Sequence, residues 1–172
     1  MGIITNSDFV GKFELSITQF NTDLIDSYIE RYEKLYLTKL LGVELYNLFI
    51  SDLDVNNVPQ TAIYETIYNA LSIDVDNEVL FSYGMKDLIL GIVYYEYTKD
   101  NVIKQTPIGS VKTKNENSEV TSNNQWLTNR YNESIESFKA IQYYINDNLN
   151  DYPTFNGQVI KYEYFLWKIF TI

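Results

Sequence analysis

Hydrophobic positions recur at helical spacing over two long stretches of the chain. Between residues 22 and 41 they are three and four residues apart and form a single apolar face, which predicts an amphipathic helix. This face consists of Ile25, Tyr28, Ile29, Tyr32, Leu35, Tyr36 and Leu40. A second, more regular stripe predicts a helix from about residue 124 to 149. It consists of Leu127, Tyr131, Ile135, Phe138, Ile141, Ile145 and Leu149.

Shorter helical segments are expected on either side of the first long helix. Residues 5–15 begin with one turn, which Asn6 or Ser7 can cap and which Gly11 breaks. Gly42 ends the first long helix, because glycine adopts positive φ without a Cβ clash. The short helix that follows carries the apolar residues Leu45, Tyr46, Phe49 and Ile50.

Two further helices are predicted in the middle of the chain. Pro59 suits the first turn of one of them, and its apolar stripe is Ile63, Ile67, Ala70 and Leu71. Residues 72–79, SIDVDNEV, are rich in acidic side chains and are interpreted as a link. A helix from about Tyr83 to Thr98 follows, in which Gly84 and Gly91 lie on nearly the same face and allow a neighbouring helix to approach closely.

The polar residues 101–124 depart from this helical pattern. They lack helical periodicity and contain a Pro-Ile-Gly turn. Residues 110–114 and 118–121 are expected to pair as a weak hairpin, and their polar character argues against burial in their own subunit. We therefore expect residues 105–122 to form an arm that touches neighbouring subunits. Its contact residues would be Ile108, Val111, Lys112, Lys114 and Val120.

The C-terminal residues 153–172 are the second exception. They begin with proline and glycine and end in a dense run of aromatic and branched residues, which favours an extended conformation from Val159 onwards. Chain ends are commonly polar, so an end this apolar requires a cover, either the core of its own chain or a partner. We expect this tail to dock on a partner through Val159, Ile160, Tyr162, Tyr164, Phe165, Leu166, Trp167, Ile169 and Phe170.

Together these elements predict one mainly α domain over residues 1–172. It would be a bundle of about four to five helices with a long polar arm and an extended C-terminal tail. A chain of 172 residues buries roughly 70% of its unfolded surface, so it needs neither a metal nor a disulfide to fold.

Composition narrows the functional classes. The net charge is −10 and no basic block occurs, which argues against tight binding of nucleic acid. The chain has 16 tyrosines, whose apolar rings with polar tips suit surfaces that become buried on assembly. An AT-rich coding sequence, whose codons favour tyrosine, is an alternative explanation. The absence of cysteine fits a cytosolic setting and excludes a disulfide scaffold.

Membrane contact is not expected. The N-terminus has neither a basic region nor a long apolar run, so a signal peptide is not predicted. The longest apolar stretch, Leu88–Tyr95, contains Gly91 and is too short to span a bilayer.

Two acidic clusters have part of the spacing of a calcium-binding loop. The sequence Asp52-x-Asp54-x-Asn56 has the first three ligand positions of an EF-hand, but its sixth position is asparagine rather than glycine and its twelfth is isoleucine rather than glutamate. Asp74-x-Asp76-x-Glu78 fails in the same way. Both are interpreted as solvated loops, and no metal site or cofactor is predicted.

Catalysis is not expected either. The chain contains no histidine and no cysteine, so the common catalytic triads and the usual zinc ligands are missing. Neither a Walker loop nor a GxGxxG motif occurs. Paired carboxylates remain open in principle, but the acidic residues have no recognisable spacing. We predict that the protein is not an enzyme.

The packing pattern resembles one family. The sequence Ile29-x-x-Tyr32-Glu33-x-x-Tyr36-Leu37-x-x-Leu40-Leu41-Gly42-x-x-Leu45-Tyr46 is similar to the first long helix of phage head–tail connector proteins, the adaptor or head-completion proteins below the portal. Ser82-x-Gly84-Met85-Lys86-Asp87 resembles the start of their central helix, and the arm with Pro107-x-Gly109 resembles their inter-helix loop. The order of elements is similar over most of the chain, and the connectors of crAss-like phages are among those it resembles.

The resemblance implies a helical subunit of a ring, usually a dodecamer, in the neck of a bacteriophage virion that assembles in the host cytoplasm. Such a ring docks on the portal protein, receives a tail protein or second ring protein, and lets DNA pass through its lumen without specific binding. Acidic charge along a lumen keeps DNA from adhering. The main alternative is a soluble helical protein-binding module or regulator without catalytic activity, and a carboxylate hydrolase is a third reading.

Overall fold

The computed structural model describes residues 2–15, 22–106, 109–112 and 125–158. The long helices are α1 (Thr22–Leu41), α4 (Met85–Val102) and α5 (Gln125–Asp147), and the short ones are α2 (Val43–Ser51) and α3 (Ala62–Tyr68). Two 3₁₀ helices, η1 (Asn6–Asp8) and η2 (Gly11–Phe13), precede them. Strands β1 (Leu71–Val75) and β2 (Glu78–Ser82) form one hairpin, and β3 (Ile103–Thr106) and β4 (Gly109–Lys112) form another. The prediction of a mainly α fold is confirmed.

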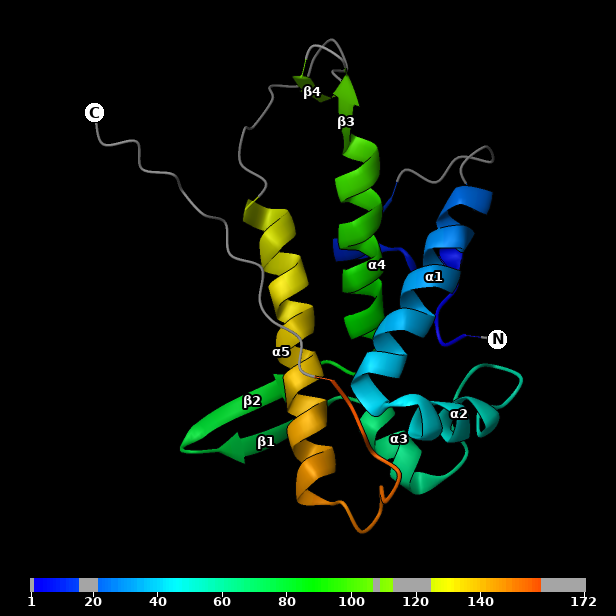
Figure 1. Ribbon diagram of the computed structural model, residues 1–172, viewed down its shortest axis with the longest axis vertical. Coiled ribbons are helices and arrows are strands. Elements are labelled where there is room, and N and C mark those ends of the chain that lie inside the picture. The colour runs from blue at the N-terminus through cyan, green and yellow to red at the C-terminus, as the bar shows by residue number, and fades with distance from the viewer. Residues whose placement is uncertain (1, 16–21, 107–108, 113–124, 159–172) are drawn as a thin grey trace.

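The centre of the fold is α4, which lies between α1 and α5 (Figure 1). Every residue from Leu88 to Tyr95 is buried, so this part of α4 has no polar face. A helix that is apolar all round must be covered on every side. The N-terminal segment supplies the remaining cover, because Phe9 and Phe13 are buried and the Phe13 ring lies 6.0 Å from that of Tyr94.

Charged side chains connect the N-terminal segment to α4 and α1. The Lys86 ammonium lies 2.9 Å from Asp8, and the Lys12 ammonium lies 3.0 Å from Asp87. A third contact is buried: the carboxylate of Glu33 on α1, which is 5% exposed, accepts hydrogen bonds of 3.0 Å from the backbone N–H groups of residues 3 and 4. Glu33 therefore replaces the backbone partners that this irregular segment lacks.

The predicted faces of α1 and α5 are largely correct. Ile25, Ile29, Tyr36 and Leu40 are buried on α1, whereas Leu35 is 40% exposed and its assignment to the core face is wrong. The buried arc is turned towards Leu37 and Leu41, because α1 packs against α2 and the N-terminal segment as well as α4. The α5 stripe is buried from Leu127 to Ile145, but the helix ends at Asp147 and Leu149 is exposed beyond it.

The two glycines singled out in the central helix have different roles. Gly91 lies where α4 and α5 approach closely, as predicted, and an added Cβ there would meet Ser134 of α5. Gly84 lies outside the helix, which begins two residues later than expected, at Met85. Its φ of +98° makes it part of the turn from β2 into α4, so its assignment to a helix face is wrong. Gly42 does end α1, with a φ of +82°.

The helix predicted after Pro59 is shorter and begins later. Pro59 forms an isolated β-bridge with Leu53, and α3 starts at Ala62. The Asp52 carboxylate accepts hydrogen bonds from the backbone N–H groups of residues 60 and 61, which delays the start of the helix. Ala70 and Leu71 lie beyond the end of α3, so placing them on its stripe was wrong.

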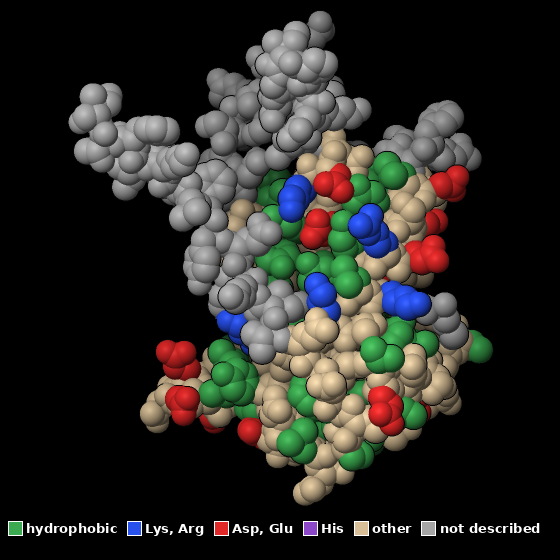
Figure 2. Space-filling model, in the orientation of Figure 1, with side chains coloured by type: hydrophobic (Ala, Val, Ile, Leu, Met, Phe, Trp, Pro, Cys, Tyr) green, Lys and Arg blue, Asp and Glu red, His purple; other side chains and the backbone are tan. Residues whose placement is uncertain are grey.

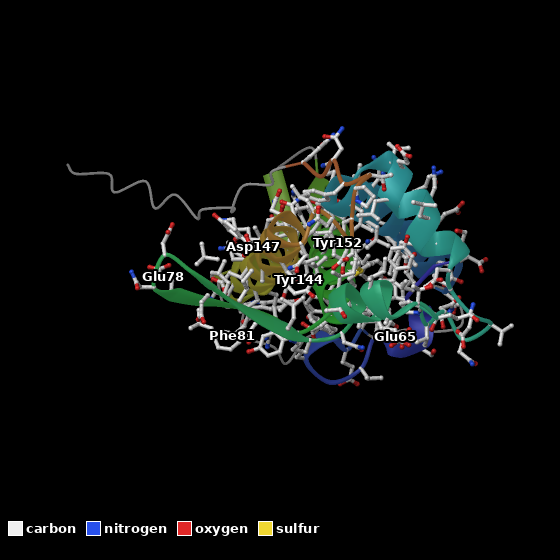
Figure 3. The ribbon with its side chains drawn as sticks, turned by 90° about the horizontal axis from the view of Figure 1, so that it is seen from below. Glu65, Glu78, Phe81, Tyr144, Asp147 and Tyr152 are labelled. Atoms are coloured by element: carbon white, nitrogen blue, oxygen red, sulfur yellow. The ribbon has the colours of Figure 1, made fainter. Side chains whose placement is uncertain are left out.

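The stretch interpreted as an acidic link is the β1–β2 hairpin, and this correction is the largest in the fold. Asp76 and Asn77 have φ of +51° and +69°, which is the backbone of a two-residue turn matched to the twist of a hairpin. Along β1 the half-buried Leu71, Ile73 and Val75 alternate with two exposed residues. Figure 3 shows the hairpin crossing beside α5, with Phe81 on the side away from Tyr144.

The second hairpin includes part of the predicted arm. Residues 109–112 do form a strand, but they pair antiparallel with 103–106, from Ile103 opposite Lys112 to Thr106 opposite Gly109. The predicted partner, 118–121, lies outside the described residues. Because α4 runs directly into β3, this hairpin stands at the end of α4, towards the same end of the molecule as the starts of α1 and α5 (Figure 1).

Candidate functional site

The described part of the chain contains little of the predicted contact surface. Val111 and Lys112 lie in β4, whereas Ile108, Lys114 and Val120 lie outside the described residues. The nine tail residues between Val159 and Phe170 that were predicted to dock also lie outside them. Of the predicted contact residues, the structure therefore describes only Val111 and Lys112, which are neighbours in β4.

Residues 153–158, the first part of the predicted tail, pack on their own chain. The N–H of Asn156 donates to the Leu41 carbonyl at 3.3 Å, and that of Gln158 to the Lys39 carbonyl at 2.6 Å. The Gln142 side chain of α5 donates to the carbonyls of Leu40 and Gln158, both at 3.1 Å. These bonds satisfy carbonyls at the end of α1 and reduce the segment proposed for docking to residues 159–172.

The Asp52–Asn56 cluster uses its carboxylates within its own loop. Asp54 accepts from the N–H groups of Asn56 and Val58 at 2.8 and 2.9 Å, and these bonds, chiefly that from Val58, lower its pKa. For Asp52, burial by itself raises the pKa, but the bonds from residues 60 and 61 outweigh it and hold the pKa below its usual value. Across the described residues, no three acidic side chains converge where a metal ion could bind.

The most distinctive surface of the described residues is a groove of about 670 Å³ between the β1–β2 hairpin and the N-terminal half of α5. Residues 78–81 of β2 and Tyr83 line one side of it, Arg130, Glu133 and Glu136 of α5 line the other, and Lys12 completes the lining. Three apolar side chains on β2 and directly after it are exposed at this groove: Val79 by 51%, Phe81 by 59% and, one residue beyond the strand, Tyr83 by 67%.

The backbone of β2 has a free edge at this groove. In a hairpin with a two-residue turn, the residues that flank the turn exchange hydrogen bonds and the pairing then alternates. From the turn at Asp76–Asn77, the N–H and C=O groups of Val79 and Phe81 point away from β1. Tyr83 follows in the same alternation, and its outward N–H donates to the Ser137 hydroxyl of α5 at 3.3 Å. Val79 and Phe81 have no such partner in the described part of the chain.

The cations in the groove already have partners, whereas two of its acids do not. Lys12 pairs with Asp87, and Arg130 pairs with Glu133 at 3.1 Å. The described ranges give no ion-pair partner for Glu78 or Glu136, which both line the groove. The unbalanced charge of the groove is therefore negative, and Figure 2 shows further acidic side chains at the hairpin tip beside hydrophobic ones.

A basic cluster lies elsewhere, on the outer face of α1. Arg31, Lys34 and Lys39 surround the exposed Leu35 at a hollow of about 400 Å³ that Gln158 also lines. Figure 2 shows Lys and Arg side chains on this face of the molecule. No helix within the described ranges combines the length and the hydrophobicity that crossing a bilayer requires.

Comparison with known proteins yields no relative: no protein-family model, no curated protein and no solved structure matches the chain. The likeness to phage connectors therefore stays a prediction from the sequence. Among the described residues, the groove offers a free strand edge, an apolar patch and acids without an ion-pair partner. These features are suited to binding a polypeptide.

Sequence reasoning missed this groove because it missed the hairpin. The signals were present: apolar residues alternate at 71, 73 and 75, and the Asp76–Asn77 pair is suited to a turn with positive φ. The acidic side chains at alternate positions obscured them, since such residues are also typical of solvated links.

Proposed function

We propose that this protein is a structural subunit of a phage head–tail connector, which forms a ring below the portal and has no catalytic role. The observation that carries the proposal is the free edge of β2 beside the exposed Val79, Phe81 and Tyr83. Proteins that work as monomers usually cover or charge such an edge, because it pairs with other chains. The choice of family comes from the packing pattern of residues 29–46, which form α1, Gly42 and α2.

The arrangement of the segments favours a ring over a symmetric dimer. The β3–β4 hairpin stands at the end of α4, towards the end of the molecule at which α1 starts (Figure 1), whereas Gln158 is bonded to the last turn of α1. The two segments proposed for contacts therefore leave the helical body near opposite ends of α1. A subunit that uses two different surfaces makes head-to-tail contacts, and such contacts form a ring when the rotation between neighbours closes and an open filament when it does not.

The charge of the chain supports a role around DNA rather than on it. A net charge of −10 repels the phosphate backbone. A lumen lined by such subunits would let DNA slide through, whereas a basic lumen would retain it.

The proposal is tested by measuring the mass of the purified full-length chain, alone and mixed with the portal protein of the same phage, by native mass spectrometry. We expect a ring of one defined stoichiometry, either in solution or only on the portal. A variant lacking residues 159–172 should lose ring formation, portal binding or both. The control variant Val55→Ser, which removes an exposed apolar side chain elsewhere, should assemble normally.

The alternative has a clear outcome in the same experiment. A full-length chain that stays monomeric or dimeric and does not bind the portal indicates a helical protein-binding module instead. Normal assembly of the variant without residues 159–172 would show that the tail is not needed for ring formation or portal binding.

A further inference from the structure

An incoming strand would find four backbone groups on the edge of β2 that have no partner among the described residues, the N–H and C=O of Val79 and of Phe81. Beyond Phe81 the edge is closed, because Tyr83 already bonds to Ser137 on α5. The free stretch lies beside the groove lined by Arg130, Glu133 and Glu136. The geometry is therefore that of a short docking edge with an adjacent groove for side chains.

We infer that this edge binds the C-terminal residues 159–172 of a second copy of the chain as an added strand. The inference rests on the proposed ring, since a ring brings copies together. It deepens the proposal by assigning the docking segment a partner surface within the ring itself.

Charge favours this occupant. Residues 159–172 contain Lys161 and Lys168 against the single acid Glu163, although the whole chain has 23 acidic and 13 basic residues. The groove presents the carboxylates of Glu78 and Glu136, for which the described ranges give no ion-pair partner. A net basic segment of an acidic protein thus meets a net acidic groove, which steers the two together.

The alternation of residues 160–164, at the start of the tail, suits a strand with one apolar face. In an extended chain alternate side chains share a face, so Ile160, Tyr162 and Tyr164 would lie together, followed by Leu166. Lys161 and Glu163 would lie on the other face, which becomes apolar only from Phe165 onwards. An added strand places one of its faces beside the exposed Val79 and Phe81, and the apolar face is the one that gains by covering them.

The position of Gln158 favours a second copy over the same chain. Its carbonyl is bonded to Gln142 of α5, whereas the groove lies beside Glu133. These two α5 residues are nine apart, which is about two and a half helical turns and places them on opposite sides of the helix. The tail therefore starts on the side of α5 away from its own groove.

Disulfide cross-linking tests the inference directly, because the chain has no native cysteine. One full-length chain carries Val79→Cys, and another carries a single tail cysteine from Tyr162→Cys, Tyr164→Cys or Leu166→Cys. The two are mixed and oxidised gently. We expect a disulfide-linked pair of chains for at least one tail position.

The control moves the cysteine to the other edge of the same hairpin. Asp74 lies directly opposite Val79 in register and is also exposed, so Asp74→Cys should cross-link at least tenfold less. Equal yields from both edges, or no cross-link at any tail position, would overturn the inference. The inference would also be overturned if a disulfide forms only within a single chain that carries both cysteines and never between two chains.

A pair of proline variants tests the role of the backbone. Phe81→Pro removes an outward N–H and leaves the bonds between β1 and β2 in place, and Ser72→Pro does the same on the opposite edge, since Ser72 pairs with Phe81. In the Val79→Cys chain we expect Phe81→Pro to reduce cross-linking at least tenfold and Ser72→Pro to leave it unchanged. Equal effects of the two prolines on the cross-linking yield would contradict strand addition. If either proline unfolds the hairpin, the comparison of cross-linking yields between Val79→Cys and Asp74→Cys tests strand addition instead.

The two proposals fail separately. Cross-links between copies without a ring or portal complex would contradict the proposed connector function and support the docking edge. Rings that bind the portal without any cross-link at the β2 edge would support the connector function and contradict the docking edge.

Discussion

Ser134 of α5 packs directly against Gly91 of α4, and this contact sets how closely the two helices approach. A Cβ added at Gly91 would overlap the Ser134 hydroxyl, whereas its next neighbours, Phe13 and the Arg130 carbonyl, would lie at 3.4 and 3.5 Å, which is close to normal van der Waals distance. The hydroxyl itself donates to the Arg130 carbonyl at 3.2 Å. The crowding at Gly91 therefore comes from one oxygen atom.

Gly91→Ala is expected to destabilise the fold by about 1–3 kcal/mol through overpacking, partly offset by about 1 kcal/mol of gained helix propensity. In a Ser134→Ala background the offending oxygen is gone, so the same substitution should become neutral or stabilising. Urea denaturation of the two single variants and the double variant measures the coupling. Additive effects would show that the oxygen does not limit the helix approach.

Glu33→Ala is expected to lower the free energy of unfolding by at least about 2 kcal/mol, because it leaves the buried N–H groups of Ile3 and Ile4 without an acceptor. Glu33→Gln keeps one acceptor oxygen and should cost less. Glu30→Gln, at an exposed position of the same helix, is the control and should have little effect. A loss for Glu33→Ala no larger than the control's would show that this carboxylate does not hold the segment.

The same residue predicts a pH dependence. Burial raises the pKa of Glu33 above its ordinary 4.5, outweighing the hydrogen bonds from residues 4 and 3. The folded protein therefore binds this proton more readily than the unfolded one. The resulting stabilisation is fully present below pH 4.5 and is lost as pH rises through the raised pKa. The stability of the wild type relative to Glu33→Gln should thus increase as pH falls from neutral, as chemical denaturation at several pH values can measure.

Tyr28 predicts a loss of stability in alkali. Burial and the 2.8 Å hydrogen bond to Asp100 raise its pKa from 10.0 to about 12. The contribution of Tyr28 to the free energy of unfolding is present below pH 10 and disappears as pH rises through about 12. Tyr28→Phe should remove this part of the alkaline transition, whereas Tyr143→Phe, at an exposed position, should not. Identical alkaline transitions for the two variants would contradict the assignment.

The turn of the β1–β2 hairpin gives a conformational prediction. Asn77 has a φ of +69°, so Asn77→Ala should cost about 1 kcal/mol through the Cβ clash of the left-handed region. Asn77→Gly should be neutral or stabilising. Asn47→Ala, on the exposed side of α2, should be stabilising because alanine favours a helix. Thermal and urea denaturation distinguish these signs, and a neutral Asn77→Ala would contradict the turn geometry.

The long helices were predictable because their apolar residues repeat over several turns. The α5 stripe from Leu127 to Ile145 is buried along its whole length, and such a repeat has no competing interpretation as a strand. Start and end positions were less certain, as α3 shows, since its start depends on hydrogen bonds from residues 60 and 61 to Asp52. Side-chain bonds of this kind are not visible in a hydrophobic pattern.

The candidate site was not predictable, for a physical reason. The groove joins β2, the N-terminal segment and α5, which are far apart in the sequence. The buried role of Glu33 was equally hidden, because its partners are main-chain N–H groups that every residue except proline possesses. Patterns identify elements, whereas surfaces between elements follow from their packing.

The anchoring of residues 156–158 has a mechanical consequence. A pull on the chain at Gln158 is not directed along α5, because the bonds to Lys39 and Leu41 and the bridging Gln142 side chain pass the load to the end of α1. The force then acts on two helices at once. If residues 159–172 dock as proposed, tension on them would therefore be carried by α1 and α5 together.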